Sequence, residues 1–169
     1  MADPVSSSFL VDAYSDPVLI RVLARASFAN SGSFREFTIE MMRLGRRKFV
    51  IDFSSCTGMD STFLGVLAGL ALDLRKTDPK GTVVFCRLGV RNLELIRNLG
   101  LHRLATVDFG GDLAAADGAD TPLEEKKLGE LENARMCLEA HENLVETDQE
   151  NESRFQDVLV YLKNRVDQG

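Results

Sequence analysis

The chain has 169 residues, which suits one domain of ordinary size or a small domain with an appendage. Hydrophobic residues make up 44% of it, enough for a core, but no apolar run is long enough to predict a membrane span. The net charge of −6 is uneven, because residues 1–108 carry 14 Lys/Arg and 11 Asp/Glu whereas residues 109–169 carry 6 and 15. An acidic C-terminal part repels phosphate backbones, so nucleic-acid binding is not expected.

The N-terminal residues and the cysteines indicate where the protein works. Residues 1–16 lack a basic stretch followed by an apolar one, so they are not typical of a secretory signal. Cys56, Cys86 and Cys137 are odd in number and form no CxxC pair, which excludes a disulfide framework. A reducing, cytoplasmic compartment is therefore predicted.

Apolar runs bounded by turn residues predict strands alternating with helices. Strands are expected over 7–13, 18–26, 48–53, 82–88 and 103–109, and helices over 34–45, 62–78 and 92–100. Ser31 or Ser33 is expected to cap the first helix, and Gly45 to end it. Gly65 and Gly69 lie on one face of the second helix and are expected to let its backbone approach the sheet. This order predicts an α/β fold with a largely parallel sheet.

The C-terminal part of the chain reads differently. Residues 109–122 are small, acidic and contain glycine, as expected of a linker. Two amphipathic helices are predicted in 123–169, with their apolar stripes at Leu131, Ala134, Leu138, His141 and Val145, and at Phe155, Val158, Leu159, Leu162 and Val166. Such helices cannot bury their stripes alone, so they must pack on the domain, on each other or on a second chain.

The sequence offers no recognisable catalytic machinery. It contains no GxxxxGK[ST] loop, GxGxxG fingerprint or GxSxG elbow. His102 and His141 lie far from any cysteine or carboxylate cluster with metal-ligand spacing, and His141 is interpreted as an interface or surface residue. A non-enzymatic protein without metal or cofactor is therefore predicted.

Asp60, Ser61 and Thr62 stand where an apolar strand gives way to the long helix. A serine there can cap the helix by accepting a hydrogen bond from a backbone N–H group. Helix N-termini also stabilise anions, so a phosphate on Ser61 would find donors and would add about −1.5 to −2 charges. Both interpretations remain open from the residues alone.

Residues about 7–108 resemble a STAS domain, the fold of sulphate transporters and anti-sigma-factor antagonists. The resemblance is carried, in order, by "FVIDFSSC", "MDSTFLGVLAGL" and "GTVVFCRLGVRNLELIRNLGLHRLATVD". It implies a mixed, mostly parallel sheet with helices largely on one face. The chain then divides into a STAS-like domain (1–108), a linker (109–122) and a helical extension (123–169).

The resemblance also implies a mechanism. Antagonists of this family bind a serine-kinase-type anti-sigma partner through the loop and helix, and a PP2C-type phosphatase reverses the phosphorylation. Carried over, the phosphorylated residue is Ser61, with Thr62 as a substitute acceptor. The partner-binding residues are Asp60, Ser61, Thr62, Phe63 and Leu64.

A second hypothesis keeps the fold and removes the phosphorylation. Phe63 stands where the family usually has a small residue, and the helical extension lies outside the family core. The same surface would then bind a partner or lipid constitutively. The C-terminal helices would form a homodimer.

Overall fold

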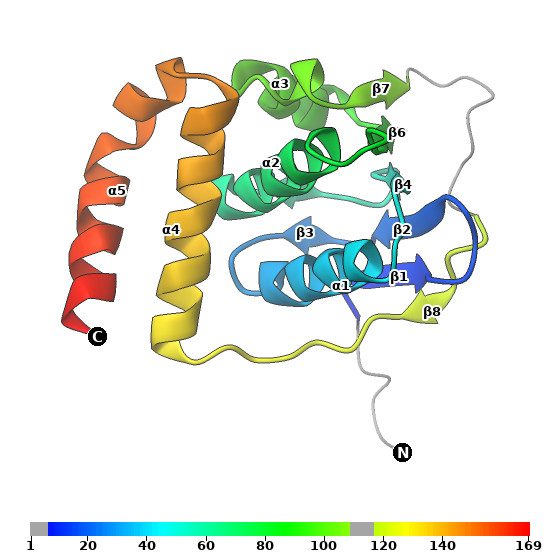
Figure 1. The fold of residues 1–169 in the computed structure, drawn as a ribbon, viewed down its shortest axis with the longest axis horizontal. Coiled ribbons are helices and arrows are strands. Elements are labelled where there is room, and N and C mark those ends of the chain that lie inside the picture. The colour runs from blue at the N-terminus through cyan, green and yellow to red at the C-terminus, as the bar shows by residue number, and fades with distance from the viewer. Residues whose placement is uncertain (1–6, 109–116) are drawn as a thin grey trace.

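A computed structural model describes residues 7–108 and 117–169 (Figure 1). The strands in these ranges are β1 (Phe9–Asp12), β2 (Val18–Val22), β3 (Arg25–Ala26), β4 (Lys48–Asp52), β5 (Gly58–Met59), β6 (Thr82–Cys86), β7 (Thr106–Asp108) and β8 (Thr121–Pro122). The helices are α1 (Ser31–Arg43), α2 (Ser61–Arg75), α3 (Val90–Asn98), α4 (Glu130–Thr147) and α5 (Glu150–Gln168), with a 3₁₀ turn at Leu101–Arg103.

The main sheet has six strands in the order β7-β6-β4-β2-β1-β8. Its pairs β2–β4, β4–β6 and β6–β7 are parallel, whereas β1 is antiparallel to both β2 and β8. The central register places Ile51 between Ile20 and Phe85, and all three side chains are fully buried. The predicted α/β fold with a mixed, mostly parallel sheet is confirmed.

The core lies on the face of the sheet that α1 and α2 cover (Figure 1). In β1 and β2, buried residues alternate with half-buried ones, so one face of the sheet is packed and the other is partly open. α2 is apolar over most of its surface and buries ten of its residues. A helix this deeply buried needs cover on more than its sheet-facing side, and α4 supplies it.

Several predicted boundaries were wrong. The run 18–26 is not one strand, because β3 leaves the main sheet and pairs with β5 in a separate two-stranded sheet. Ser31 and Ser33 do not cap α1; both lie inside it, and Asn30 precedes it without a side-chain capping bond. The expected strand over 103–109 is shorter, because its start forms the 3₁₀ turn and residue 109 lies outside the described residues. Gly45 follows α1 with φ of +92°, as the expected helix-ending glycine does.

The segments after β7 join the same body. β8 lies within the segment 109–122 and pairs with β1, although residues 109–116 of that segment lie outside the described residues. α4 packs across α2, and α5 lies on the outer side of α4 (Figure 1). The division of the chain into domains remains a prediction. No helix among the described residues combines the length and apolar character that crossing a bilayer requires.

Candidate functional site

Asp60, rather than a serine, caps helix α2. Its extended backbone places the carboxylate over the first turn, where Oδ1 accepts a hydrogen bond from the Phe63 N–H at 2.9 Å. Oδ2 accepts a second one from the Phe28 N–H at 2.8 Å, which fixes the loop before α1. The helix terminus therefore already has its negative group, and the hydroxyl of Ser61 is free for another contact.

That contact is His141 of α4. Ser61 is half-buried, and its Oγ lies 2.9 Å from Nε2 of His141. The other ring nitrogen, Nδ1, lies 2.7 Å from the carbonyl oxygen of Cys137, which can only accept. Nδ1 therefore carries a proton, and in the neutral ring Nε2 accepts a hydrogen bond from the Ser61 hydroxyl.

His141 is the site residue that sequence reasoning missed. Its side chain is 3% exposed and packs edge-on against Phe155 of α5, with ring centroids 5.1 Å apart. Of the two expected positions, interface or surface, the structure shows the interface, between α4, α2 and α5, and its place in the apolar stripe of α4 was a correct signal of burial. The structure thus joins a hydroxyl and an imidazole that lie 80 positions apart.

Three of the expected partner-binding side chains point inward. Thr62 is 5% exposed and directs its hydroxyl at the Cys137 sulfur, 3.6 Å away. Phe63 is fully buried and packs against the rings of Phe9 and Phe34, and Leu64 is 2% exposed. These three side chains cannot form the expected docking surface in this arrangement, because they serve the core and the α2–α4 contact.

The glycines of α2 face α4 and not the sheet, which corrects the sequence-based expectation. A Cβ on Gly65 would lie 2.1 Å from the carbonyl oxygen of Ala140, so the two helix backbones touch there. A Cβ on Gly69 would meet the side-chain nitrogen of Asn143, which also donates to the Gly65 carbonyl at 3.2 Å. Small residues allow such close helix packing because nothing projects from the backbone.

A shallow apolar depression adjoins Ser61. It encloses about 420 Å³ between the start of α2 and α5, and its lining includes Phe28, Thr62, His141, Val158 and Tyr161. Phe28 and Tyr161 are 52% and 67% exposed. The described residues hold no cluster of His, Cys, Asp or Glu suited to a metal ion.

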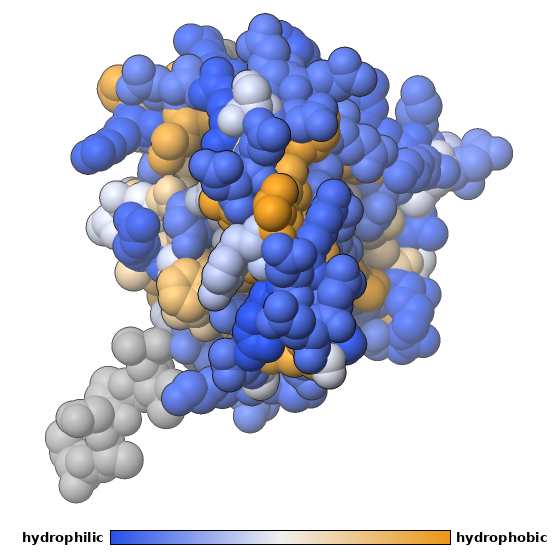
Figure 2. All heavy atoms as spheres, turned by 90° about the vertical axis from the view of Figure 1, so that its left-hand side faces the viewer, coloured by the Kyte–Doolittle hydropathy of each residue, from blue (hydrophilic) through white to orange (hydrophobic). Residues whose placement is uncertain are grey.

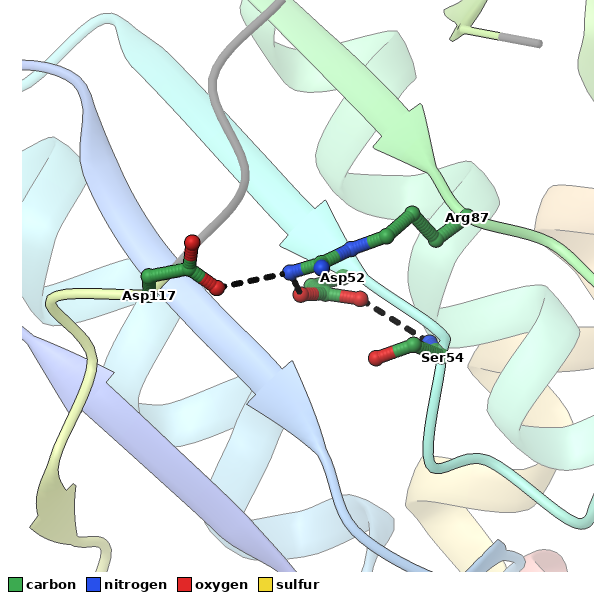
Figure 3. Close-up of polar contacts among 4 residues, drawn as sticks. All are labelled: Asp52, Ser54, Arg87 and Asp117. Atoms are coloured by element: carbon green, nitrogen blue, oxygen red, sulfur yellow. Dashed lines mark hydrogen bonds and ion pairs between the residues drawn. The ribbon is translucent and has the colours of Figure 1, made fainter. Parts of the chain in front are cut away.

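A second polar cluster lies at the carboxyl ends of the central strands (Figure 3). Asp52, at the end of β4, is buried and pairs with Arg87, which also lies 2.9 Å from Asp117. Burial alone would raise the pKa of Asp52, but hydrogen bonds from the Ser54 N–H and from Arg87 outweigh it and lower that pKa. Arg87 adopts φ of +55°, the left-handed region, to reach both carboxylates. The cluster ties residue 117 to the sheet, so we assign it a structural role.

The same cluster affects Cys86, the last residue of β6. Burial and the charge of Asp52 raise the pKa of its thiol to about 11. At 2% exposure this thiol packs in the core.

Comparison with known proteins gives one family and several solved structures. The sequence model of the STAS domain matches residues 8–114, well over half of the chain. Two similar structures are the anti-sigma factor antagonist SpoIIAA in its unphosphorylated form and the Bacillus cell fate determinant SpoIIAA in the phosphorylated form. Both give a TM-score of 0.50, at 13% and 15% identity, and the aligned region covers 62% and 60% of this chain and 90% and 92% of theirs. No curated protein matches the chain.

Proposed function

Because residues 8–114 match its sequence model, the chain belongs to the STAS domain family, and from that membership we propose that it is an anti-sigma-factor-antagonist-like switch. In its unmodified form it binds a serine-kinase-type anti-sigma partner in the cytoplasm. The kinase phosphorylates Ser61, which weakens binding, and a PP2C-type phosphatase restores the hydroxyl.

The observation that carries the proposal is the position of Ser61. Its hydroxyl follows the capping Asp60 at the first residue of α2, is half-buried, and makes its hydrogen bond through a side chain rather than through the helix backbone. Thr62, the alternative acceptor, is buried against Cys137. The similarity to SpoIIAA, solved in unphosphorylated and phosphorylated forms, supports the same assignment.

Phosphorylation would change this site in two ways. In a phosphoserine Oγ is an ester oxygen without a proton, so the hydrogen bond that the Ser61 hydroxyl donates to His141 is lost. It also brings about −1.5 to −2 charges beside the carboxylate of Asp60, which already uses the N–H groups of Phe63 and Phe28. The repulsion between the phosphate and the Asp60 carboxylate, and the loss of the Ser61 hydroxyl as a donor, both change the surface that a partner would contact.

We predict that a serine-kinase-type anti-sigma partner with ATP adds one phosphate to the full chain, at Ser61. Intact-mass measurement followed by peptide mapping checks this. Ser61→Ala should abolish the modification, whereas Thr62→Val and Ser54→Ala, a change at an exposed serine of the neighbouring loop, should keep it. Phosphate on Ser61→Ala, or its loss with Thr62→Val alone, would contradict the assignment.

The constitutive scaffold is the second candidate function. The apolar depression beside Ser61 favours it, because exposed Phe28 and Tyr161 could bind a partner without any modification. Dimerisation through the C-terminal helices has less support, since Met136, Leu144, Leu159 and Leu162 are buried within one chain. Viewed from the α5 side, the surface is mostly hydrophilic with a narrow apolar stripe (Figure 2).

A further inference from the structure

Helix α4 occupies the side of α2 from which Ser61 would be reached. The Ser61 hydroxyl points at the buried His141 ring rather than at open solvent. A kinase must bring the γ-phosphate of ATP and its own base to this oxygen, nearly in line. While Nε2 of His141 lies 2.9 Å from Oγ, part of that approach is filled by α4.

No partner can enter between the two helices as they stand. At Gly65 the backbones touch, and Thr62, two residues after Asp60, contacts Cys137. Asn143 uses the Gly65 carbonyl as an acceptor. The first two turns of α2 are therefore already engaged by α4.

We propose that α4, together with the α5 helix packed on it, is an internal cap that must leave α2 before a kinase-type partner binds and phosphorylates Ser61. This inference rests on the proposed function, and it adds a regulatory step to the same site. The aligned region of the SpoIIAA structures covers about 60% of this chain, and the family match ends at residue 114, so the cap lies beyond the shared fold.

The way the cap is attached allows it to move as a unit. α5 packs mainly on α4 (Figure 1) and meets the sheet domain at its first turn, where Asn151 donates to the Leu99 carbonyl. The stretch 124–127 before α4 is exposed and is held to the domain by hydrogen bonds from Ser8 to Glu125 and from the Lys126 N–H to Ser33. The ion pairs Arg35–Glu139 and Lys76–Glu146 at the rim are partly in solvent, so each contributes little to holding α4 in place.

The corner between α4 and α5 also carries an unsatisfied group. Asn151 is fully buried, and its Nδ2 donates to the carbonyl oxygens of Leu99 and Leu144. Its Oδ1 has no hydrogen-bond partner among the described residues. A buried acceptor without a donor makes this corner less stable than its two Nδ2 hydrogen bonds alone would suggest.

A single substitution can lock the cap. Thr62 Oγ1 lies 3.6 Å from Cys137 Sγ, so Thr62→Cys places a second thiol beside a natural one on the facing helix. Oxidation should then join α2 to α4. Burial raises the pKa of the Cys137 thiol, so the oxidation is best carried out at alkaline pH. The matched control is Thr62→Cys combined with Cys137→Ser, which cannot form the bond.

The measured quantity is the rate of Ser61 phosphorylation by the kinase-type partner. We expect oxidised Thr62→Cys to be phosphorylated about tenfold more slowly than the same protein after reduction, and the control to be unaffected by oxidant. Equal rates in the oxidised and reduced forms would overturn the cap and leave the phosphorylation proposal standing.

A second variant separates failure of the cap from failure of the switch. Ala140→Glu puts a charged side chain against Gly65 and should displace α4, so it should be phosphorylated faster than the wild type. If Ala140→Glu is phosphorylated and the wild type is not, the result supports the cap. If neither protein is phosphorylated, both the proposed Ser61 switch and the α4 cap are contradicted.

Discussion

Gly65→Ala is expected to lower the free energy of unfolding by about 2 kcal/mol or to detach α4 from α2. The added methyl group would sit 2.1 Å from the carbonyl oxygen of Ala140 and 2.4 Å from its carbonyl carbon. Both are backbone atoms, so a whole helix must shift to make room. This cost exceeds the gain of about 1 kcal/mol that alanine brings over glycine inside a helix.

Gly69→Ala is the matched control on the same helix. There a Cβ would meet only the end of the Asn143 side chain, which can rotate away. The same gain in helix propensity should leave this variant neutral or slightly stabilised. Urea denaturation followed by circular dichroism measures the free energy of unfolding of both variants. Equal changes would mean that the α4 backbone does not pack against Gly65.

Arg87→Ala is expected to destabilise the fold by about 3 kcal/mol at neutral pH. The substitution leaves the Asp52 carboxylate buried without its cationic partner, with the Ser54 N–H as its remaining donor in the cluster of Figure 3. It also releases Asp117 from the sheet. Arg91→Ala, at an exposed site on α3, should cost much less, as surface substitutions usually do.

The destabilisation should depend on pH in a defined direction. The folded-state pKa of Asp52 is lowered, so its contribution to stability is present above the unfolded-state pKa of about 3.9 and is lost as pH falls through the folded value. Below that value Asp52 is neutral, and removing Arg87 costs little. The gap between wild type and Arg87→Ala should therefore shrink as pH falls below about 3.9 and through the folded-state pKa, and a constant gap would contradict the buried pair.

The sequence predicts which segments are buried better than it predicts what they are buried against. The order of strands and helices through β7 was predictable except for the two-residue strands β3 and β5, because each longer element carries its own apolar period. The partner of the Gly65–Gly69 face was not, because periodicity marks a contact face without naming the element that fills it. The choice of the sheet over α4 was wrong for that reason.

The site shows the same division. The position of Asp60 and Ser61 at a helix start was predictable from the change of period. Phe63 could have been placed in the core, since it precedes Leu67 by one helical turn on the buried side. The Ser61–His141 bond could not, because it joins segments 80 residues apart and depends on how a helix outside the family fold docks.

The most direct test of the switch is the affinity of the kinase-type partner for the full chain before and after complete phosphorylation of Ser61, measured by calorimetry at one salt concentration. The account predicts that the phosphorylated chain binds at least about tenfold more weakly, a loss of about 1.4 kcal/mol. Equal dissociation constants for the two forms would contradict it and would favour the constitutive scaffold.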